Sequence, residues 1–459
     1  MRTDPIRRRA WQVLTAGLEG GLLDPVLDRA LAETPDPRDR AFLAELVRGT
    51  LQWQGRYDHV IACFAQKAPP RDPGLLMILR MALHQMLALD SVPAFAAVHQ
   101  AVELAKAAGE RSRAGFVNGL LQAVSRKVLG EVGGAAPSFA AKEARLRPLF
   151  SRLGPEDGPA FLAAWHSHPL WLVERWVRSL GPGAAADLCA FNNLKVPVDL
   201  HVLHPATVEE AAAWAESAGL GPTMGVGTAG LRLEHRPPRG RLKELLEGRP
   251  GLIVQDATVQ EATAWLASAL LPGRPGPVLD MCAAPGGKTA HLGAVPGIRN
   301  GALIAMEPDA RRMGLLTGTL VRTRTGAVRI RGDGLRPPFS PGSFAAVLLD
   351  GPCTGTGVLR HHPEARWRLD EMTVARKAGV LIDLADRAAD LLAPGGVLMY
   401  ATCSLEPEEN QAVTARLLDR GDLEPLPDAR GRWQRLWTPP DAPGDGFFGA
   451  VLRRTKAEG

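Results

Sequence analysis

Apolar residues recur every three or four positions along the first part of the chain. This spacing runs through residues 6–129 and is the period of an amphipathic α-helix. Segments rich in proline, aspartate and glycine interrupt it and separate successive helices; they lie at 34–39, 68–74 and 90–94. We therefore expect an all-helical domain over residues 1–135.

Two shorter regions follow before the pattern changes. Residues 136–160 are rich in glycine and alanine and predict a linker. Residues 161–250 combine short apolar runs with helical segments, which indicates a small α+β domain. Trp165, Trp171 and Trp176 fall at helical spacing there, which favours packing in a core over stacking on bases.

From residue 251 onward, short apolar runs alternate with segments of helical period. This alternation is typical of a doubly wound parallel sheet. It predicts a Rossmann-like α/β domain over 251–459, in which ligands bind beyond the carboxyl ends of the strands. The runs expected to form strands are 277–282, 302–307, 327–333, 344–351 and 395–403.

Composition narrows the class of protein. The chain has 459 residues, of which 46% are hydrophobic and 22% charged, as in a globular protein of about three domains. Residues 1–150 hold 20 Lys and Arg against 15 Asp and Glu, whereas the remainder holds 34 of each. A basic excess in the helical part fits an anionic partner such as nucleic acid, and an ordinary solvated surface explains it equally well.

Five cysteines without a C-x-x-C pair argue against a disulfide framework and a structural zinc site. The N-terminus lacks the apolar core of a signal peptide, and the apolar stretch at 75–89 is interrupted by Arg80. We expect a cytoplasmic monomer with no membrane segment and no metal. Cys63 and Cys189 lie in helical segments, where we expect small buried hydrophobic side chains.

Polar groups gather at the ends of the first four expected strands. The first strand leads through a glycine-rich turn into a helix, where backbone N–H groups can approach a ligand. The turn is neither G-x-G-x-x-G nor a Walker loop. The next three strands end near Glu307, Asp333 and Asp350, where carboxylates suit a ribose diol or an adenine amino group. The turn comprises Cys282, Ala283, Ala284, Pro285, Gly286, Gly287 and Lys288.

These features predict a nucleoside-bearing cofactor without a pyrophosphate, and S-adenosyl-L-methionine fits them better than NAD. Any one of the three acids is more often a helix cap or a loop residue, but three at one sheet edge favour a site. Close packing inside the turn is a sufficient reason for Cys282.

Two cysteines lie at the same predicted edge. Cys353 follows the fourth strand and Cys403 the fifth, so both thiols would share one pocket. A thiolate that adds to C6 of a pyrimidine makes C5 carbanion-like, and C5 can then attack a methyl donor. Asp350 is placed to hydrogen-bond the ring near N3, and the base must be unpaired or flipped out. Spacing alone leaves open which cysteine attacks.

The motifs "DMCAAPGGKT", "LLDGPCTGTGVLRHHPEARW", "YATCSLEPEEN" and "DGFFGAVL" resemble the bacterial ribosomal RNA cytosine-5 methyltransferases of the Fmu/Sun (RsmB) family. The segments "FLAELVRGTLQW", "ILRMALHQMLALDSVPAFAAVHQAVELAK" and "FVNGLLQAV" resemble the NusB-like RNA-binding domain that precedes the catalytic domain in that family. The resemblance spans nearly the whole chain, including the order of the domains.

The resemblance implies that Cys403 is the nucleophile and that Cys353 assists release of the methylated product. It implies an S-adenosyl-L-methionine site lined by residues 282–288, Glu307, Asp333 and Asp350. Lys288 would lie close to the cofactor and the target base. The implied substrate is a cytosine of small-subunit (16S) ribosomal RNA.

Three positions depart mildly from the family pattern. Gly351 replaces the usual Ala of Asp-Ala-Pro-Cys, Thr354 stands where Ser is common, and Glu307 replaces the more usual Asp. None of them removes a reacting group.

Other hypotheses are a non-catalytic NusB-like RNA-binding or antitermination factor, and the same chemistry on DNA or transfer RNA. Intact Cys353, Cys403 and Asp350 argue against a scaffold, which needs none of them. His361 and His362 follow the Pro-Cys loop, and we expect loop or RNA-contacting residues there rather than metal ligands.

Overall fold

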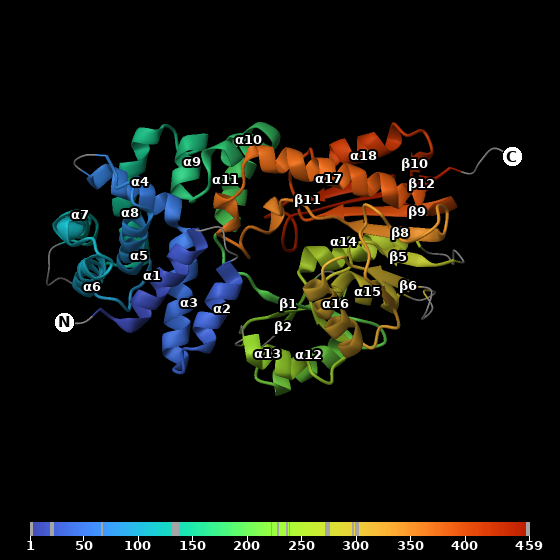
Figure 1. Cartoon of the computed structure of the whole chain (residues 1–459), viewed down its shortest axis with the longest axis horizontal. Coiled ribbons are helices and arrows are strands. Elements are labelled where there is room, and N and C mark those ends of the chain that lie inside the picture. The colour runs from blue at the N-terminus through green and yellow to red at the C-terminus, as the bar shows by residue number, and fades with distance from the viewer. Residues whose placement is uncertain are drawn as a thin grey trace. The chain divides into compact units, whose positions relative to one another are not determined.

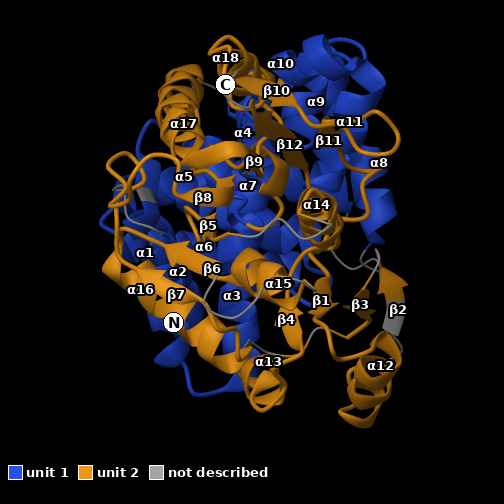
Figure 2. Ribbon diagram, turned by 90° about the vertical axis from the view of Figure 1, so that its right-hand side faces the viewer, with its two compact units in different colours: residues 1–193, 362–368 blue, residues 194–361, 369–459 orange. Residues whose placement is uncertain are grey.

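A computed structural model describes the chain except residues 1–2, 19–22, 66–67, 131–136, 222, 227–228, 236, 238, 271–275, 296–297, 299–302 and 456–459. The chain forms two compact units (Figures 1 and 2). Unit 1 comprises Met1–Asn193 and His362–Arg368, and unit 2 comprises Leu194–His361 and Leu369–Gly459.

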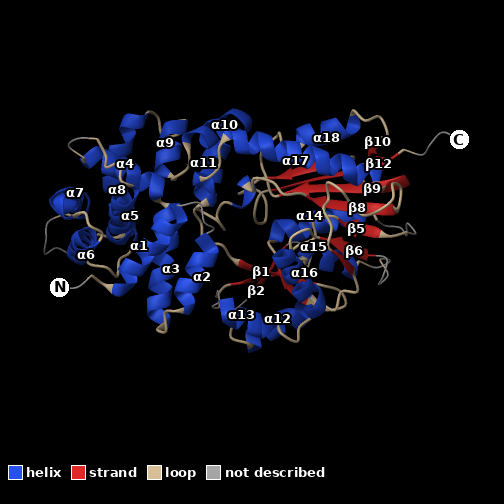
Figure 3. Cartoon of the chain, viewed as in Figure 1, coloured by secondary structure: helices blue, strands red, loops and turns tan. Residues whose placement is uncertain are grey.

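Helices joined by loops make up the described part of unit 1, as the three-to-four spacing predicts (Figure 3). Aspartates cap two of its helices: Asp36 accepts from two backbone N–H groups at the start of α3, and Asp72 accepts from Leu75 N at the start of α5. The helices are α1 (Pro5–Leu18), α2 (Leu23–Ala32), α3 (Pro37–Gln52), α4 (Gln54–Phe64), α5 (Pro73–Ala88), α6 (Ala94–Ala107), α7 (Ala114–Val124), α8 (Phe139–Phe150), α9 (Pro159–Trp165), α10 (Leu170–Leu180) and α11 (Pro182–Phe191), with short helices η1 (Arg111–Arg113), η2 (Ser125–Leu129), η3 (Ser151–Leu153) and η5 (Ala365–Trp367).

The centre of unit 1 is α5. Most of its residues from Leu75 to Leu87 are buried, because α1, α3, α4, α6, α7 and α8 all pack against it. A helix that is apolar on all sides belongs in a core. Within the described part of the chain, no helix is both long and apolar enough to cross a membrane.

The structure differs from the expected boundaries after residue 135. The described part of the expected linker 136–160 contains α8 and η3, and residues 161–193, expected in the small α+β domain, fold with unit 1. An aromatic cluster explains this: the Trp165 ring lies 5.1 Å from Phe150 and 5.8 Å from Phe161. Helical period alone does not reveal which neighbouring core such aromatic residues join.

The expected burial of side chains in these helices is confirmed in part. Trp165 and Trp176 are buried in the core, as predicted, and Trp171 is half-buried. Cys189 is buried, but the prediction for Cys63 is wrong, because this side chain is exposed on α4.

Unit 2 contains a small antiparallel sheet with strand order β2-β3-β1-β4. Its apolar face packs on Trp214 of α12 and on Leu246 of α13. The α+β character is as predicted, although it begins near residue 198 rather than 161. The elements are β1 (Val198–Val202), α12 (Val208–Ser217), β2 (Thr223–Val226), β3 (Gly230–Leu233), α13 (Arg239–Leu246) and β4 (Leu252–Val254).

The larger sheet of unit 2 has the order β10-β12-β9-β8-β5-β6-β7, with β11 paired to β12. Strands β7, β6, β5, β8 and β9 are parallel, and β12 runs antiparallel to β9. All five expected strands are present. The strands are β5 (Val278–Asp280), β6 (Leu303–Met306), β7 (Val328–Ile330), β8 (Phe344–Asp350), β9 (Leu392–Thr402), β10 (Leu423–Pro425), β11 (Gln434–Trp437) and β12 (Phe447–Arg454).

Helices cover both faces of this sheet (Figure 1). Leu349 of β8 packs with α17 and α18, whereas its neighbour Leu348 packs on the opposite face with α14 and α15. Burial on both faces explains why these strands are almost continuously apolar. The helices are α14 (Ala257–Ser268), α15 (Gly287–Ala294), α16 (Ala310–Arg322), η4 (Thr356–Val358), α17 (Glu371–Asp390) and α18 (Gln411–Leu418).

The connections reverse direction at β5. From β5 the chain proceeds to β6 on one side, while β8 pairs on the other. In sheets of this kind the crevice at such a reversal, beyond the carboxyl ends of the strands, is the usual ligand site.

Candidate active site

The glycine turn joins β5 to α15 at the reversal point. Gly286 caps α15 with φ of 104°, a left-handed conformation that favours glycine. A Cβ at this residue would approach Leu316 Cδ1 to 3.0 Å and Thr319 Cβ to 3.1 Å. The turn therefore needs a glycine both for its backbone and for its packing against α16.

Asp280, at the end of β5, is a buried acid that the sequence analysis did not single out. Thr289 Oγ1 donates to its Oδ2 at 2.6 Å, while its buried Oδ1 has no partner among the described residues. Burial raises the pKa of this carboxyl to about 7. Its place as the last residue of the first strand is a signal that could have identified it.

Glu307 follows β6 and is almost fully buried. Asp309 N donates to its Oε1 at 3.1 Å, and its Oε2 lies 3.6 Å from Arg312 Nη1 without a hydrogen bond in the described structure. A buried carboxylate oxygen without a donor costs free energy unless a ligand supplies one. A ribose diol has the donors that this oxygen requires.

The other two predicted acids differ in their surroundings. Asp333 lies beyond β7, where its side chain is exposed and accepts from Leu335 N at 2.9 Å, as a turn cap does. Asp350 ends β8 and pairs with Lys288, whose Nζ lies 2.7 Å from Asp350 Oδ2.

Lys288 brings positive charge to the carboxyl edge of the sheet. Burial alone would lower the pKa of this ammonium, but the charge and hydrogen bond of Asp350, together with Cys403, raise it above its ordinary value. The Lys288 Nζ also lies 5.2 Å from the centre of the Phe447 ring. Lys288 is therefore a positively charged group that interacts electrostatically with Cys403.

Cys353 and Cys403 lie together, as the strand ends predict. Strands β8 and β9 are parallel neighbours with Asp350 opposite Ala401, and the two Sγ atoms that follow are 3.3 Å apart. The hydrogen bond to Cys403, followed by burial, raises the pKa of Cys353 well above its usual range. Cys353 therefore keeps its proton, and either thiol can donate in the contact between the two sulfur atoms.

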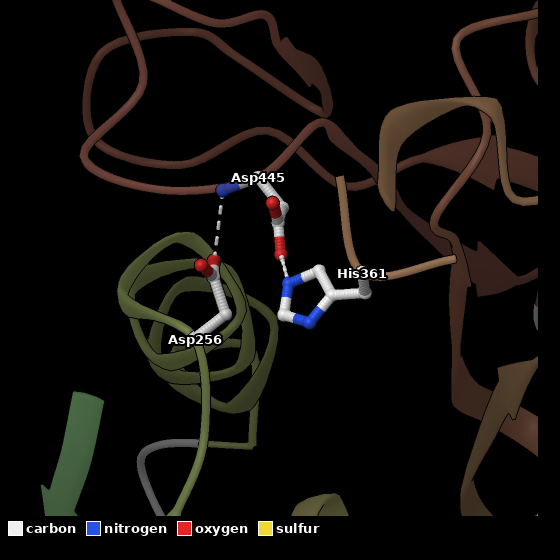
Figure 4. A group of neighbouring side chains, drawn as sticks. All are labelled: Asp256, His361 and Asp445. Atoms are coloured by element: carbon white, nitrogen blue, oxygen red, sulfur yellow. Dashed lines mark hydrogen bonds and ion pairs between the residues drawn. The ribbon is translucent and has the colours of Figure 1, made fainter. Parts of the chain in front are cut away.

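A second polar cluster brings together Asp256, His361 and Asp445 (Figure 4). Ligand atoms of Asp256, His361 and Asp445 lie within 4.8 Å of one another. Arg360 pairs with both carboxylates, at 3.2 Å from Asp256 and 2.5 Å from Asp445, and His361 Nε2 lies 2.5 Å from Asp445. A guanidinium thus already supplies positive charge between the acids, and the group links three segments of unit 2 as an ion-pair network.

His362 belongs to unit 1, unlike His361. Its Nδ1 lies 3.6 Å from Asp24 and 3.8 Å from Glu364. Burial by itself would raise the pKa of Glu364, but the hydrogen bond with His362 and the nearby positive charges together lower it. The same hydrogen bond raises the pKa of His362. Two adjacent loop histidines therefore serve two different ion-pair groups.

Comparisons with known proteins agree with this division of the chain. The family model for the 16S rRNA methyltransferase RsmB/F matches residues 267–453. The model for the NusB family matches residues 5–126. The predicted order of a helical NusB-like domain followed by an α/β methyltransferase domain is thereby confirmed.

Several curated proteins are similar over most of the chain. The probable ribosomal RNA small subunit methyltransferase B of Synechocystis is 33% identical, over 86% of this chain and 84% of its own length. The protein with the same name in Bacillus subtilis is 31% identical over 84% of this chain and 82% of its own length. A putative methyltransferase of Mycobacterium tuberculosis is 34% identical over 98% of this chain and 97% of its own length.

Solved structures share the fold. The crystal structure of PH0851 is 24% identical and covers 99% of this chain and 100% of its own, with a TM-score of 0.73. A methyltransferase homologue from Pyrococcus horikoshii is 25% identical and has a TM-score of 0.54. The match covers 66% of this chain and 100% of the homologue. On these matches, together with the domain order and the paired thiols, the chain belongs to the RsmB/F family of 16S rRNA methyltransferases.

Proposed function

We propose that this methyltransferase transfers a methyl group to C5 of a cytosine in small-subunit ribosomal RNA, with S-adenosyl-L-methionine as donor and Cys403 as nucleophile. The observation that carries the proposal is the pair of thiols 3.3 Å apart at the carboxyl edge of the sheet. The salt bridge between Lys288 and Asp350 lies at the same edge.

The residues at the reversal point suit the proposed donor. S-adenosyl-L-methionine supplies an electrophilic methyl group. Glu307 offers a buried carboxylate oxygen to a ribose hydroxyl, and the turn 282–288 offers backbone N–H groups near a helix start. Asp333 would complete the acidic edge from its exposed turn.

The proposed reaction begins at Cys403. Its thiolate adds to C6 of the cytosine, which makes C5 nucleophilic enough to accept the methyl group. The Lys288 ammonium stabilises the negative charge on that sulfur, since the two groups interact electrostatically. Asp350, held by Lys288, would accept a hydrogen bond from N3 once the addition of the thiolate draws a proton to that nitrogen.

Release requires the C6–S bond to break. When a base removes the C5 proton, the electron pair of the C5–H bond re-forms the C5–C6 double bond and expels Cys403 as a thiolate. A hydrogen bond from Cys353 would stabilise the departing sulfur, because the raised pKa of Cys353 keeps its proton in place. Cys353 is therefore assigned to product release.

The substrate assignment rests on the relatives and on the helical domain. Curated relatives are named small subunit methyltransferase B. The NusB family match coincides with the part of the chain that holds the basic excess. The target base must leave its stack to reach a pocket beyond the strand ends.

The first test is methyl transfer from labelled S-adenosyl-L-methionine to unmodified small-subunit ribosomal RNA, with transfer RNA in parallel. We expect label at cytosine C5 with the wild type, none with Cys403→Ala, and a covalent protein–RNA adduct on a denaturing gel with Cys353→Ala. An adduct with Cys403→Ala and an inactive Cys353→Ala would reverse the two roles. RNA binding by the wild type without methylation of any RNA would favour a non-catalytic factor.

A further inference from the structure

The acidic segment that follows Cys403 contains a carboxylate with no role in the reaction as described above. Glu409 precedes α18 and is completely buried. Taking a carboxylate out of water is costly unless its oxygens receive hydrogen bonds. The partners of Glu409 therefore indicate what this burial achieves.

Glu409 binds the residue that follows Cys353. Thr354 N donates to Glu409 Oε1 at 2.8 Å, and Thr354 Oγ1 donates to Oε2 at 2.5 Å. The N–H bond belongs to the peptide group between Cys353 and Thr354. A carboxylate held by both donors thus fixes the orientation of that peptide, and with it the direction of the Cys353 side chain.

The same carboxylate also binds the residue that follows Cys403. Ser404 hydrogen-bonds Glu409, and its Oγ lies 3.3 Å from Thr354 Oγ1. Thr356 Oγ1 accepts from Leu405 N at 2.9 Å and lies 3.3 Å from Ser404 Oγ. The loops that carry the two thiols are therefore joined next to each cysteine.

Glu409 is itself anchored to the sheet. The Tyr400 hydroxyl on β9 donates to the Glu409 carbonyl oxygen. The neighbouring Asn410 donates to Ser404 O at 2.8 Å and accepts from Thr402 Oγ1 at 2.6 Å. Because Glu409 is held to β9 in this way, its carboxylate can hold the loop after β8 in a defined position relative to the sheet.

We propose that Glu409 is a positioning residue: by holding Thr354 and Ser404 it sets the distance between Cys353 and Cys403, and so controls release of the methylated RNA. This inference rests on the proposed function, because release is the step assigned to Cys353. Glu409 touches neither sulfur in the contacts described above, and it acts through Thr354.

Glu409→Ala and Glu409→Gln separate the positioning role from the charge. Alanine removes both bonds to Thr354, so the adduct should form but resolve roughly 10- to 100-fold more slowly, the usual cost of a misplaced group. Glutamine can accept from Thr354 N and donate to Thr354 Oγ1, so Glu409→Gln should release product much as the wild type does. The dissociation constant for RNA should stay unchanged in both variants, because Glu409 acts after binding.

Three further variants complete the experiment. Thr354→Val should accumulate adduct, whereas Thr354→Ser, which keeps the hydroxyl, should not. Glu424→Ala removes a surface carboxylate on β10 that pairs with Arg453 on β12; it is the matched control and should behave as the wild type. Cys353→Ala provides the reference for complete trapping, and a melting curve for each variant reports whether it folds.

The outcomes distinguish this proposal from the proposed function. If Cys353→Ala traps the adduct but folded Glu409→Ala does not, Glu409 has no part in positioning Cys353. If Cys353→Ala does not trap the adduct either, the role assigned to Cys353 fails. The effect of Glu409 on the separation of the two thiols is then measured by disulfide formation between them.

In that second measurement diamide oxidises the Cys353–Cys403 pair. The two thiols lose two hydrogens to the azo bond, which becomes a hydrazine, and the Sγ–Sγ bond forms. We expect disulfide formation roughly tenfold slower in Glu409→Ala than in Glu409→Gln, since a misplaced thiol meets its partner less often. Equal rates in the two variants overturn the proposal.

Discussion

At the scale of single residues, Asp280 is a carboxyl whose acidity the fold changes strongly. Its carboxyl is buried at the end of β5, and burial raises its pKa to about 7 from the usual 3.8. The folded protein therefore binds a proton between about pH 4 and pH 7 that the unfolded chain has already released. Stability from this group is greatest below that window and falls as the pH rises through it.

Asp280→Asn should remove this pH dependence. At pH 8 the variant should gain stability of up to roughly 4 kcal/mol, and at pH 4 it should be close to the wild type. Thermal melting of unit 2 measured from pH 4 to pH 8 checks the slope. Asp383→Asn on the exposed side of α17 is the control; a wild-type slope in Asp280→Asn would show that the carboxyl is ionised throughout.

The residue scale also shows what strand ends can predict. Cys353 and Cys403 were expected in one pocket because parallel strands end at a common edge, and their 3.3 Å separation confirms it. The same argument predicted that Asp333 and Glu307 both lie at this edge. The Asp333 side chain is exposed, whereas the Glu307 side chain is buried. Burial depends on the loops that follow each strand, and those contacts are not local in sequence.

At the level of elements, the strand–turn–helix unit from β5 to α15 depends on Gly286. An alanine there must adopt φ near 104° and approach α16 within 3.0–3.1 Å. A left-handed conformation costs an L-residue about 1–2 kcal/mol. The turn is expected to relax by moving its N–H groups away from the position that a cofactor needs.

Gly286→Ala should weaken S-adenosyl-L-methionine binding by roughly tenfold or more, as measured by titration calorimetry. Gly314→Ala is a matched control, because a Cβ at that position of α16 meets nothing within 4 Å. Affinity should be unchanged in the control. Wild-type affinity in Gly286→Ala would mean that the turn does not contact the cofactor.

Helix and strand positions in unit 2 followed from the sequence because each strand is apolar and each helix keeps its own period. The placement of 136–193 did not follow, since glycine and alanine content predicted a linker over 136–160, and residues 161–193 were expected in the small α+β domain. Its helices are held by Phe150, Phe161 and Trp165, and contacts of this kind override a weak local signal.

For the whole molecule, one segment belongs to a unit distant in sequence. Residues 362–368 fold with unit 1, although the chain on both sides of them belongs to unit 2. Arg366 is completely buried there, and its guanidinium donates to Ser167 O, Asn192 O and Asn193 Oδ1 at 3.0–3.1 Å. Unit 1 is therefore not complete without a segment that follows the Pro-Cys loop.

Arg366→Met should destabilise unit 1 by about 3–5 kcal/mol, because two buried acceptors and one partly buried acceptor lose their donor. Differential scanning calorimetry of the full chain measures this as a lower first transition. Arg368→Met, at a more exposed position of the same segment, should shift it far less. Equal shifts in the two variants would argue that Arg366 contributes no more than a surface residue.

The sequence by itself determined the helical and α/β halves, the five parallel strands and the edge at which the two thiols meet, because these follow from local period and from the direction of parallel strands. Only the tertiary structure decided which unit residues 136–193 and 362–368 join, that Glu409 connects Thr354 with Ser404, and that Arg360 lies between Asp256 and Asp445. Those features depend on contacts between residues far apart in the chain, and hydrophobic period carries no information about such pairs.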